Sequence, residues 1–264
     1  MIVAEDLHKS LRGVDVLRGA SMDVPSGEAV ALIGASGTGK TVMLKHLAGL
    51  MQPDRGRVLL DGEDLCCVSK RNLQQIRRKI GFLFQGGALF QSMTVYENVA
   101  FPLEEQTDLS RREIGERVRN ELHVLGMDGS EQKYPAELSG GMAKRVALAR
   151  ALVQSPEIIL FDEPTTGLDP IIAQSIHDLI ADVRERLDIT AVLVTHQVPA
   201  VFGVVDRVAM LHEGVVRFQG TPEEIMKSQD PVVKEFIDNS LCGEDYCPHM
   251  QKRRQMANQE ESPK

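Results

Sequence analysis

The chain has 264 residues, of which 42% are hydrophobic and 26% are charged, and its formal net charge is −8. This length and composition suit one large α/β unit with a buried core. The acidic balance excludes the cationic surface on which sequence-independent nucleic-acid binding depends, so we expect no nucleic-acid partner.

Two further classes are not indicated by the sequence. No apolar run approaches the roughly 18 residues of a membrane span, and residues 1–6 lack the basic and apolar pattern of a signal peptide. The cysteines at positions 66, 67, 242 and 247 do not form a disulfide framework. Cys242, Cys247 and His249 offer at most half of a metal site, because a tetrahedral site needs four ligands.

The first predicted element with chemical meaning is a short apolar strand at residues 29–33, which a loop and a helix at residues 41–47 follow. The loop matches the pattern G-x-x-x-x-G-K-[ST], in which glycines let backbone N–H groups converge on phosphate oxygens. Its residues are Gly34, Ala35, Ser36, Gly37, Thr38, Gly39, Lys40 and Thr41. We expect Lys40 to reach the β- and γ-phosphates and Thr41 to bind Mg²⁺.

A second strand is predicted at residues 80–84 and ends at Gln85. The pattern then becomes helical, with a capping box from Ser110 to Glu113 and a stop at Gly126. Further along, Ser139, Gly140 and Gly141 form a turn at the start of another helix, which is a second anion site. One chain with one phosphate loop has no use for this second site, unless the turn completes the nucleotide pocket of a neighbouring copy.

Two more buried strands are predicted at residues 158–161 and 191–194. The first is followed by Asp162 and Glu163, which we expect to bind Mg²⁺ and to activate the attacking water, respectively. The second leads to His196, which taken alone is an ordinary histidine at a strand end. Strands of this kind, alternating with loops and helices, predict a doubly wound α/β fold with a parallel sheet.

These motifs follow one another in the order found in ABC-transporter ATPase subunits, and the chain resembles that family over residues 1 to 225. The resemblance implies a P-loop (RecA-like) parallel-sheet core with an N-terminal antiparallel β region and a helical insertion. It also implies a head-to-tail homodimer that holds two ATP molecules at its interface. We therefore expect an ABC ATPase domain over residues 1–240, with a core at 1–85 and 156–240, a helical subdomain at 86–155 and a tail at 241–264.

The same resemblance assigns roles to individual residues. Ser139 and Gly141 of one copy would face the γ-phosphate held by Lys40 of the other. Gln85 would sense Mg²⁺ and the attacking water, His196 would contact the γ-phosphate, and Asp169 would signal across the dimer.

Two positions depart from the family pattern. Met142 replaces the usual glutamine at the end of the Ser-Gly-Gly turn, but the serine and glycine that face phosphate remain. Leu11 stands where the family commonly places an aromatic residue against adenine. We therefore expect weak base discrimination, so that ATP and GTP bind with comparable affinity.

The tract from Phe84 to Leu103 is unusually apolar for a loop and a helix start. Its residues Phe90, Val95, Val99 and Phe101 either fill the core or line a groove for a helix of a membrane subunit. In amino-acid sequence, this tract and the segment at residues 230–237 resemble the ATPases of Mla-type or MCE-type phospholipid-trafficking systems. That resemblance implies an integral-membrane permease dimer, an MCE-domain lipid-binding protein and a small cytoplasmic regulatory subunit as partners. It places the chain peripherally on the cytoplasmic face of the inner membrane.

Two alternatives share the ATPase motifs. One is the ATPase of an amino-acid or other small-solute importer, which only the tract after Gln85 and the C-terminal segment distinguish. The other is a non-transport ABC protein of DNA maintenance or the ribosome, which the acidic charge and the absence of long insertions disfavour. An apolar stripe at residues 232–241 either docks on the chain's own core or, with the tail, contacts the partner ATPase.

Overall fold

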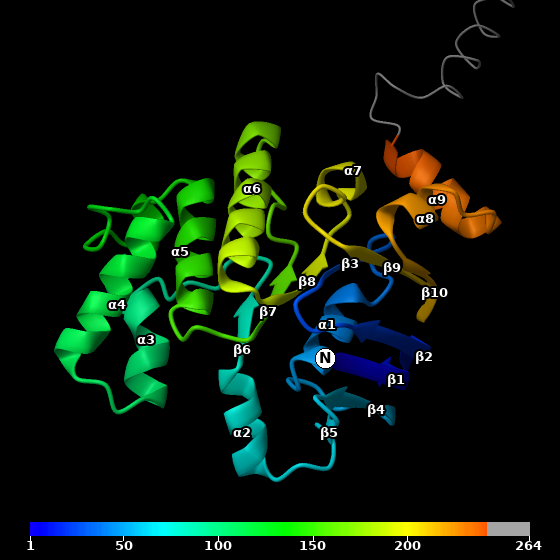
Figure 1. Ribbon diagram of the computed structural model, residues 1–264, viewed down its shortest axis with the longest axis horizontal. Helices are drawn as coiled ribbons and strands as arrows, with labels where there is room; N and C mark the ends of the chain where they lie inside the picture. Colours follow the sequence, from blue (N-terminus) through cyan, green and yellow to red (C-terminus); the bar gives the residue numbers. More distant parts are fainter. Residues whose placement is uncertain (242–264) are drawn as a thin grey trace, which may run out of the picture.

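The computed structural model describes residues 1–241, in which two β-sheets and a set of helices pack together (Figure 1). The larger sheet has the strand order β10-β9-β3-β8-β7-β6. Strands β9, β3, β8, β7 and β6 are parallel, and β10 joins the edge antiparallel to β9. Its strands are β3 (Ala29–Ile33), β6 (Ile80–Leu83), β7 (Ile158–Asp162), β8 (Thr190–Val194), β9 (Arg207–His212) and β10 (Val215–Gly220).

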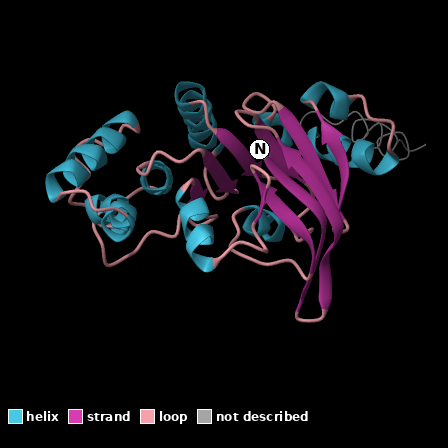
Figure 2. Ribbon diagram, turned by 60° about the horizontal axis from the view of Figure 1, so that its bottom comes forward, coloured by secondary structure: helices cyan, strands magenta, loops and turns pink. Residues whose placement is uncertain are grey.

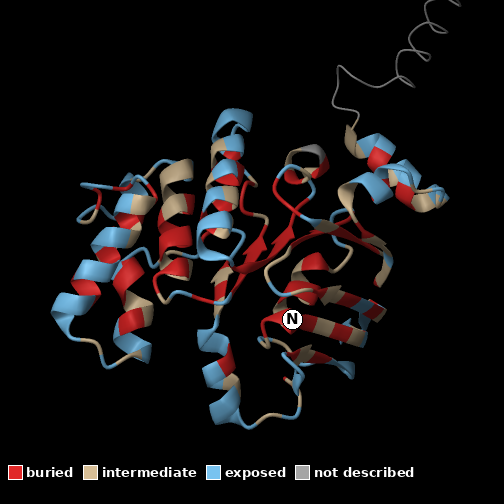
Figure 3. Ribbon diagram, in the orientation of Figure 1, coloured by how far each residue is buried: buried red, intermediate tan, exposed pale blue. Residues whose placement is uncertain are grey.

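Every residue of β3, β7 and β8 is buried, as expected for strands covered on both faces (Figure 3). Alternate residues of β3 belong to different apolar clusters. Ala29, Ala31 and Ile33 pack with the helices on one face, whereas Val30 and Leu32 pack with the second sheet and the first helix on the other. The parallel sheet is therefore the middle layer of the molecule.

The second sheet is antiparallel and has the order β2-β1-β4-β5. Its strands are β1 (Ile2–Leu11), β2 (Val14–Val24), β4 (Arg55–Leu60) and β5 (Glu63–Asp64). Figure 2 shows the long strands of the molecule lying between helices on either side. The fold class is thus confirmed: a parallel-sheet core, an N-terminal antiparallel β region and an inserted group of helices.

The helices fall into three groups along the chain. Those that flank the parallel sheet are α1 (Lys40–Leu47), α2 (Lys70–Arg78), α6 (Pro170–Leu187) and the short α7 (Val198–Val201). The inserted group, seen at the left of Figure 1, contains α3 (Val95–Gln106), α4 (Arg111–Val124), the 3₁₀ turn η1 (Pro135–Glu137) and α5 (Gly140–Leu152). The last two are α8 (Pro222–Met226) and α9 (Pro231–Leu241).

Local sequence explains where the inserted helices begin. The Ser110 hydroxyl accepts from the backbone N–H of Glu113, whose carboxylate accepts from the N–H of Ser110 in return, so the expected capping box is present. Gly126 follows the end of α4 with a φ of 66°, a conformation that suits glycine. The exact limits of the core and helical subdomains remain a prediction.

The C-terminal stripe docks on the chain's own core. Val233 and Ile237 of α9 are buried in the larger apolar cluster, and Val232 and Phe236 pack against it. The predicted contact of the tail with a partner ATPase, and the possible half-site at Cys242, Cys247 and His249, lie outside the described residues. Within residues 1–241, no helix is long and apolar enough to cross a membrane.

Candidate functional site

The phosphate loop lies between β3 and α1 and adopts a conformation that only glycine tolerates at three positions. Gly34, Gly37 and Gly39 have φ values of 149°, 80° and 102°. A Cβ on Gly34 would lie 2.3 Å from the carbonyl oxygen of Leu211, so no other residue fits there. Gly37, in contrast, has open space where its Cβ would be, which leaves room for a ligand against the backbone.

Lys40 is the first residue of α1, and only 5% of its surface is exposed. Its Nζ donates to the carbonyl oxygens of Gly34 and Ala35, at 2.9 and 2.8 Å, so the ammonium group lies over the loop. Burial lowers the pKa of Lys40, while the carboxylates of Glu163 and Asp162 oppose that change. A desolvated cation over the loop favours the binding of polyphosphate.

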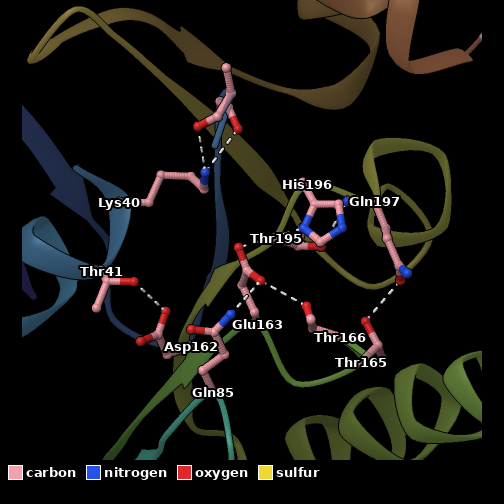
Figure 4. Close-up of polar contacts among 12 residues, drawn as sticks. Lys40, Thr41, Gln85, Asp162, Glu163, Thr165, Thr166, Thr195, His196 and Gln197 are labelled. Carbon is pink, nitrogen blue, oxygen red and sulfur yellow. Dashed lines mark hydrogen bonds and ion pairs between the residues drawn. The ribbon is translucent and has the colours of Figure 1, made fainter. Parts of the chain in front are cut away.

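Asp162 is the last residue of β7 and is 3% exposed. The hydroxyl of Thr41 donates to its Oδ1 at 2.8 Å (Figure 4). Burial raises the pKa of Asp162, the bond from Thr41 lowers it, and the neighbouring Glu163 raises it again. A hydroxyl and a carboxylate at this distance supply two oxygen donors of the kind that Mg²⁺ prefers, with the remaining positions left to water and phosphate.

Glu163 is held from several sides at the start of the following loop. Its φ is 49°, an uncommon value for a residue other than glycine, and its N–H donates to the Val194 carbonyl oxygen at 2.9 Å. Its Oε2 accepts from Gln85 Nε2 at 3.1 Å and from the Thr166 hydroxyl at 2.7 Å. These contacts fix the carboxylate in one orientation.

His196 follows β8 and lies close to the same carboxylate. Its Nδ1 is 3.5 Å from Glu163 Oε1, while 51% of its side chain remains exposed. The adjacent Gln197 accepts from the Thr165 hydroxyl at 2.8 Å, and its N–H donates to the Thr195 hydroxyl at 3.0 Å. The ends of β6, β7 and β8 thus bring Gln85, Glu163 and His196 together, as Figure 4 shows.

A pocket of about 390 Å³ lies beside these residues, although His196 and Asp162 do not line it. Lys40, Thr41, Gln85 and Glu163 line it, together with residues of the phosphate loop. Val16 of β2 forms part of its wall and packs closely on Gly39, where a Cβ would meet the valine at 2.9 Å. Leu11, at the end of β1, is 36% exposed and does not line this pocket. Weak base discrimination remains a prediction.

The Ser-Gly-Gly turn and Asp169 lie outside this pocket. Ser139 caps α5, because its hydroxyl accepts from the Met142 N–H at 3.3 Å. Asp169 caps α6 in the same way, accepting from the N–H groups of Ile171 and Ile172 at 3.1 and 3.0 Å. Ser139, Gly140 and Asp169 are exposed. The turn and the start of α6 are neighbours, because Leu168 and Ile172 pack against Gly140 and Gly141.

The apolar tract after Gln85 divides between the two roles considered for it. Val95 and Val99 are fully buried in the core. Phe90 is 42% exposed, and its ring lies 5.0 Å from that of Phe101, centroid to centroid. These two rings line a groove of about 400 Å³ between β6 and the helices α3 and α5.

Three residues that contribute to the site were not anticipated from the sequence. Thr166 bonds to Glu163, Val16 forms a wall of the pocket, and Lys144 donates from α5 to the Gln85 carbonyl oxygen. The hydroxyl pair Thr165 and Thr166, which comes directly after Glu163 and a proline, was a usable signal. Lys144 had none, because a lysine on a helix is normally a solvated residue.

The residues present fit a nucleoside triphosphate with Mg²⁺. The phosphate loop offers open space at Gly37 beside a buried ammonium group, and Thr41 with Asp162 provides an oxygen pair for the cation. Among residues 1–241 no cluster of three or more His, Cys, Asp or Glu side chains could bind a metal alone. A cation here therefore depends on phosphate oxygens as additional ligands, as is usual for Mg²⁺.

Comparison with known proteins identifies relatives over most of the chain. A family profile described as "ABC transporter" matches residues 17–166. The "Probable ribonucleotide transport ATP-binding protein mkl" of Mycobacterium leprae is 43% identical over 242 residues, which cover 92% of this chain and 70% of that protein. The "Intermembrane phospholipid transport system ATP-binding protein MlaF" of Haemophilus influenzae is 41% identical over 223 residues, which cover 84% of each protein.

Solved structures agree with these relatives. A dimeric ATP-binding cassette in a post-hydrolysis state, bound to ADP and Pi, superposes with a TM-score of 0.77 at 31% sequence identity. The match covers 84% of this chain and 98% of that cassette. Sequence and structure therefore give the same classification.

Proposed function

The chain belongs to the ATP-binding subunits of ABC transporters, and from this premise we propose that it drives phospholipid movement between the inner and outer membranes of a bacterium through a separate permease. The observation that supports phospholipid as the cargo is the 41% identity to the MlaF protein of Haemophilus influenzae, in a match that covers 84% of both chains. A relative named for ribonucleotide transport is 43% identical, but this chain covers only 70% of it. A small-solute importer is therefore the second candidate.

The proposed chemistry is hydrolysis of ATP within a homodimer. Lys40 and the loop N–H groups bind the β- and γ-phosphates. Asp162 and Thr41 hold Mg²⁺, which neutralises charge on the phosphates when bound, and Gln85 borders the same site. Glu163 orients the attacking water and accepts its proton.

The second copy completes each nucleotide site. Ser139 and Gly140 are exposed and Gly141 is half-buried at the start of α5, where the positive end of the helix favours an anion. Since they do not line the pocket that contains Lys40, they serve the γ-phosphate bound by the other copy. Asp169 lies beside them and faces the same interface. Binding of two ATP molecules closes the dimer, and hydrolysis releases it.

The groove lined by Phe90 and Phe101 is the proposed docking site for the permease. It is apolar in character, and two cations, Arg77 and Arg150, also border it. An amphipathic helix with an apolar face and an acidic side chain would fit such a groove. This contact places the subunit on the cytoplasmic face of the inner membrane as a peripheral protein. An MCE-domain protein and a small regulatory subunit belong to the same proposal.

The test is purification of the tagged chain from gently solubilised native membranes, followed by mass spectrometry of proteins and lipids. Recovery of a permease with an MCE-domain protein and phospholipid is the expected result. Recovery of a permease with a solute-binding protein would replace the phospholipid cargo with a small solute and leave the ATPase assignment intact.

A pair of variants tests whether the groove makes the contact. Phe90→Asp removes an apolar ring from the groove and places a carboxylate beside Arg150, whose guanidinium carbon lies 5.7 Å from the centre of the Phe90 ring. Recovery of the permease should be abolished, because the apolar contact is lost and the new acid competes with an acidic partner side chain for Arg150. Met226→Asp is the matched control, since Met226 is 48% exposed and its helix, α8, lies on the opposite side of the molecule from α3 (Figure 1). Equal recovery with both variants would exclude the groove as the docking site.

A further inference from the structure

Lys144 is a buried cation that the proposed chemistry does not use. It lies in the second turn of α5 with 8% of its surface exposed. Its Nζ donates to the backbone carbonyl oxygen of Gln85 at 2.5 Å. A lysine is rarely buried without a charged partner, so this contact requires an explanation.

The Gln85 carbonyl is one of three that α5 holds along the same segment. Arg150, in the last turn of the helix, donates to the carbonyl oxygens of Gly87 and Ala88 at 2.7 and 2.8 Å. Gly87 packs between these two cations, since a Cβ there would meet Ala147 at 3.4 Å. Two charged side chains therefore bind residues 85–88 to the surface of α5 with charge-assisted hydrogen bonds.

Gln85 is thus held at both ends. Its backbone is bonded to α5 through Lys144, and its side chain donates to Glu163 at 3.1 Å. The same helix begins at the Ser139 cap, the turn that the proposed dimer presents to the other copy's ATP. One continuous chain of contacts joins the turn, Lys144, Gln85 and Glu163.

The charge of Lys144 also acts on the site. Burial lowers the pKa of Lys144, while the carboxylates of Glu163 and Asp162 oppose this change. Burial likewise lowers the pKa of Lys40, and the same two carboxylates oppose that change. The two acids thus influence two desolvated ammonium groups, one from α1 and one from α5.

We propose that Lys144 is a positioning residue that couples engagement of the Ser139 turn by a second copy to the orientation of Glu163 in its own copy. It acts through Gln85 and does not touch the nucleotide. The proposal rests on the dimeric ATPase described above. It gives α5 a part in timing hydrolysis, because movement of the helix displaces the Gln85 side chain that fixes the carboxylate.

The experiment compares three variants in steady-state ATP hydrolysis and in nucleotide binding to the monomer. Lys144→Met removes the charge and the donor but keeps the apolar stem. We expect kcat to fall about tenfold or more, the effect of losing a hydrogen bond to a charged group, with nucleotide affinity within about twofold of wild type. Lys144→Arg should restore kcat to within about threefold.

Arg145→Met is the matched control. Arg145 is the next residue of α5 and also donates to a backbone carbonyl, that of Leu125, but it does not contact residues 85–88. We expect its kcat to stay within about twofold of wild type. An equal fall in kcat for both variants would show general damage to α5 and overturn the proposal.

A double-mutant cycle tests the route through Gln85. If Lys144 acts through Gln85, then Lys144→Met with Gln85→Ala should lower kcat no further than Gln85→Ala alone. Additive effects would overturn the proposal. Absence of ATP hydrolysis by the wild-type dimer would instead refute the proposed function itself, so the two failures are distinguishable.

Discussion

At the scale of single residues, the site depends on a carboxylate that the backbone alone would not place there. Glu163 has a left-handed conformation, which costs on the order of 1 kcal/mol for a residue with a side chain. Its Oε2 accepts from both Gln85 and Thr166, so the carboxylate is oriented before a substrate binds. Preorganisation of this kind is typical of a group that acts in catalysis.

The prediction for this residue separates binding from turnover. Glu163→Gln keeps the size of the side chain and removes its ability to accept a proton, so kcat should fall roughly 10²–10⁴-fold. Binding of ATP, measured by calorimetry, should remain near that of wild type. Near-normal turnover in the variant would refute the role of Glu163 as the base.

Base recognition gives a second prediction at this scale. Among residues 1–81 there is no Phe, Tyr or Trp, so the strands β1 to β5 provide no aromatic ring for a base. Stacking on an aromatic side chain contributes about 1–3 kcal/mol per base. We expect dissociation constants for ATP and GTP within about threefold of each other, and a strong preference for ATP would contradict this.

At the scale of elements, helix α6 contains a buried polar side chain that lowers the stability of the folded state. His177 is 1% exposed, and neither ring nitrogen has a hydrogen-bond partner among the described residues. An orphaned buried polar group costs about 1–3 kcal/mol. Burial also lowers the pKa of His177, so the folded state binds protons less readily than the unfolded chain.

The sign of the pH dependence follows from that shift. Below the unfolded value of about 6.5, the unfolded chain takes up protons that the native imidazole refuses, so stability falls as the pH drops. His177→Leu should remove both costs, raising Tm by about 2–4 °C at neutral pH and reducing the slope below pH 6.5. His177→Gln should reduce the slope without the gain in Tm. An unchanged slope in both variants, measured by thermal denaturation between pH 5 and 7.5, would contradict this account.

The elements also show what the sequence could predict and why. The parallel strands were predictable because each is a short, wholly apolar run, and β3, β7 and β8 are buried throughout. The limits of the antiparallel strands were not, because β1 and β2 shift register between Ala4 and Leu7, and Asp6 has a φ of 49°. Such an irregularity interrupts the alternation of polar and apolar residues on which strand prediction relies.

The same reasoning applies to the site. Carboxyl ends of parallel strands meet at one edge of a sheet, so the proximity of Lys40, Asp162 and Glu163 could be predicted from their motifs. The contact of Lys144 with Gln85 could not, because it depends on how the inserted helices pack against the core, and no local pattern encodes that packing. Only the fold reveals that a lysine in α5 is buried.

At the scale of the whole molecule, the residues that we propose to bind ATP lie on two separate surfaces of one chain. Lys40 and Glu163 border one pocket, whereas Ser139 and Asp169 are exposed elsewhere. In a head-to-tail pair, the Ser139 surface of each copy meets the Lys40 pocket of the other. Two complete sites form, and the assembly is closed at two subunits. The surface around Asp169 should therefore be buried in the dimer.

Ile171 makes this testable, because it is the most exposed large hydrophobic residue of the described chain at 81%. It follows the cap of α6, and the next residue, Ile172, packs on the Gly141 turn. Burial of its side chain in a dimer would contribute about 1.5–3 kcal/mol, and twofold symmetry applies this twice.

In a Glu163→Gln background with ATP, Ile171→Asp should weaken dimerisation at least about 100-fold by analytical ultracentrifugation, with ATP binding to the monomer unchanged. Leu187→Asp, at the other end of α6 and 42% exposed, is the control. A dimer that persists with Ile171→Asp would place the interface elsewhere, and loss of the dimer with Leu187→Asp would show that α6 itself had been disrupted.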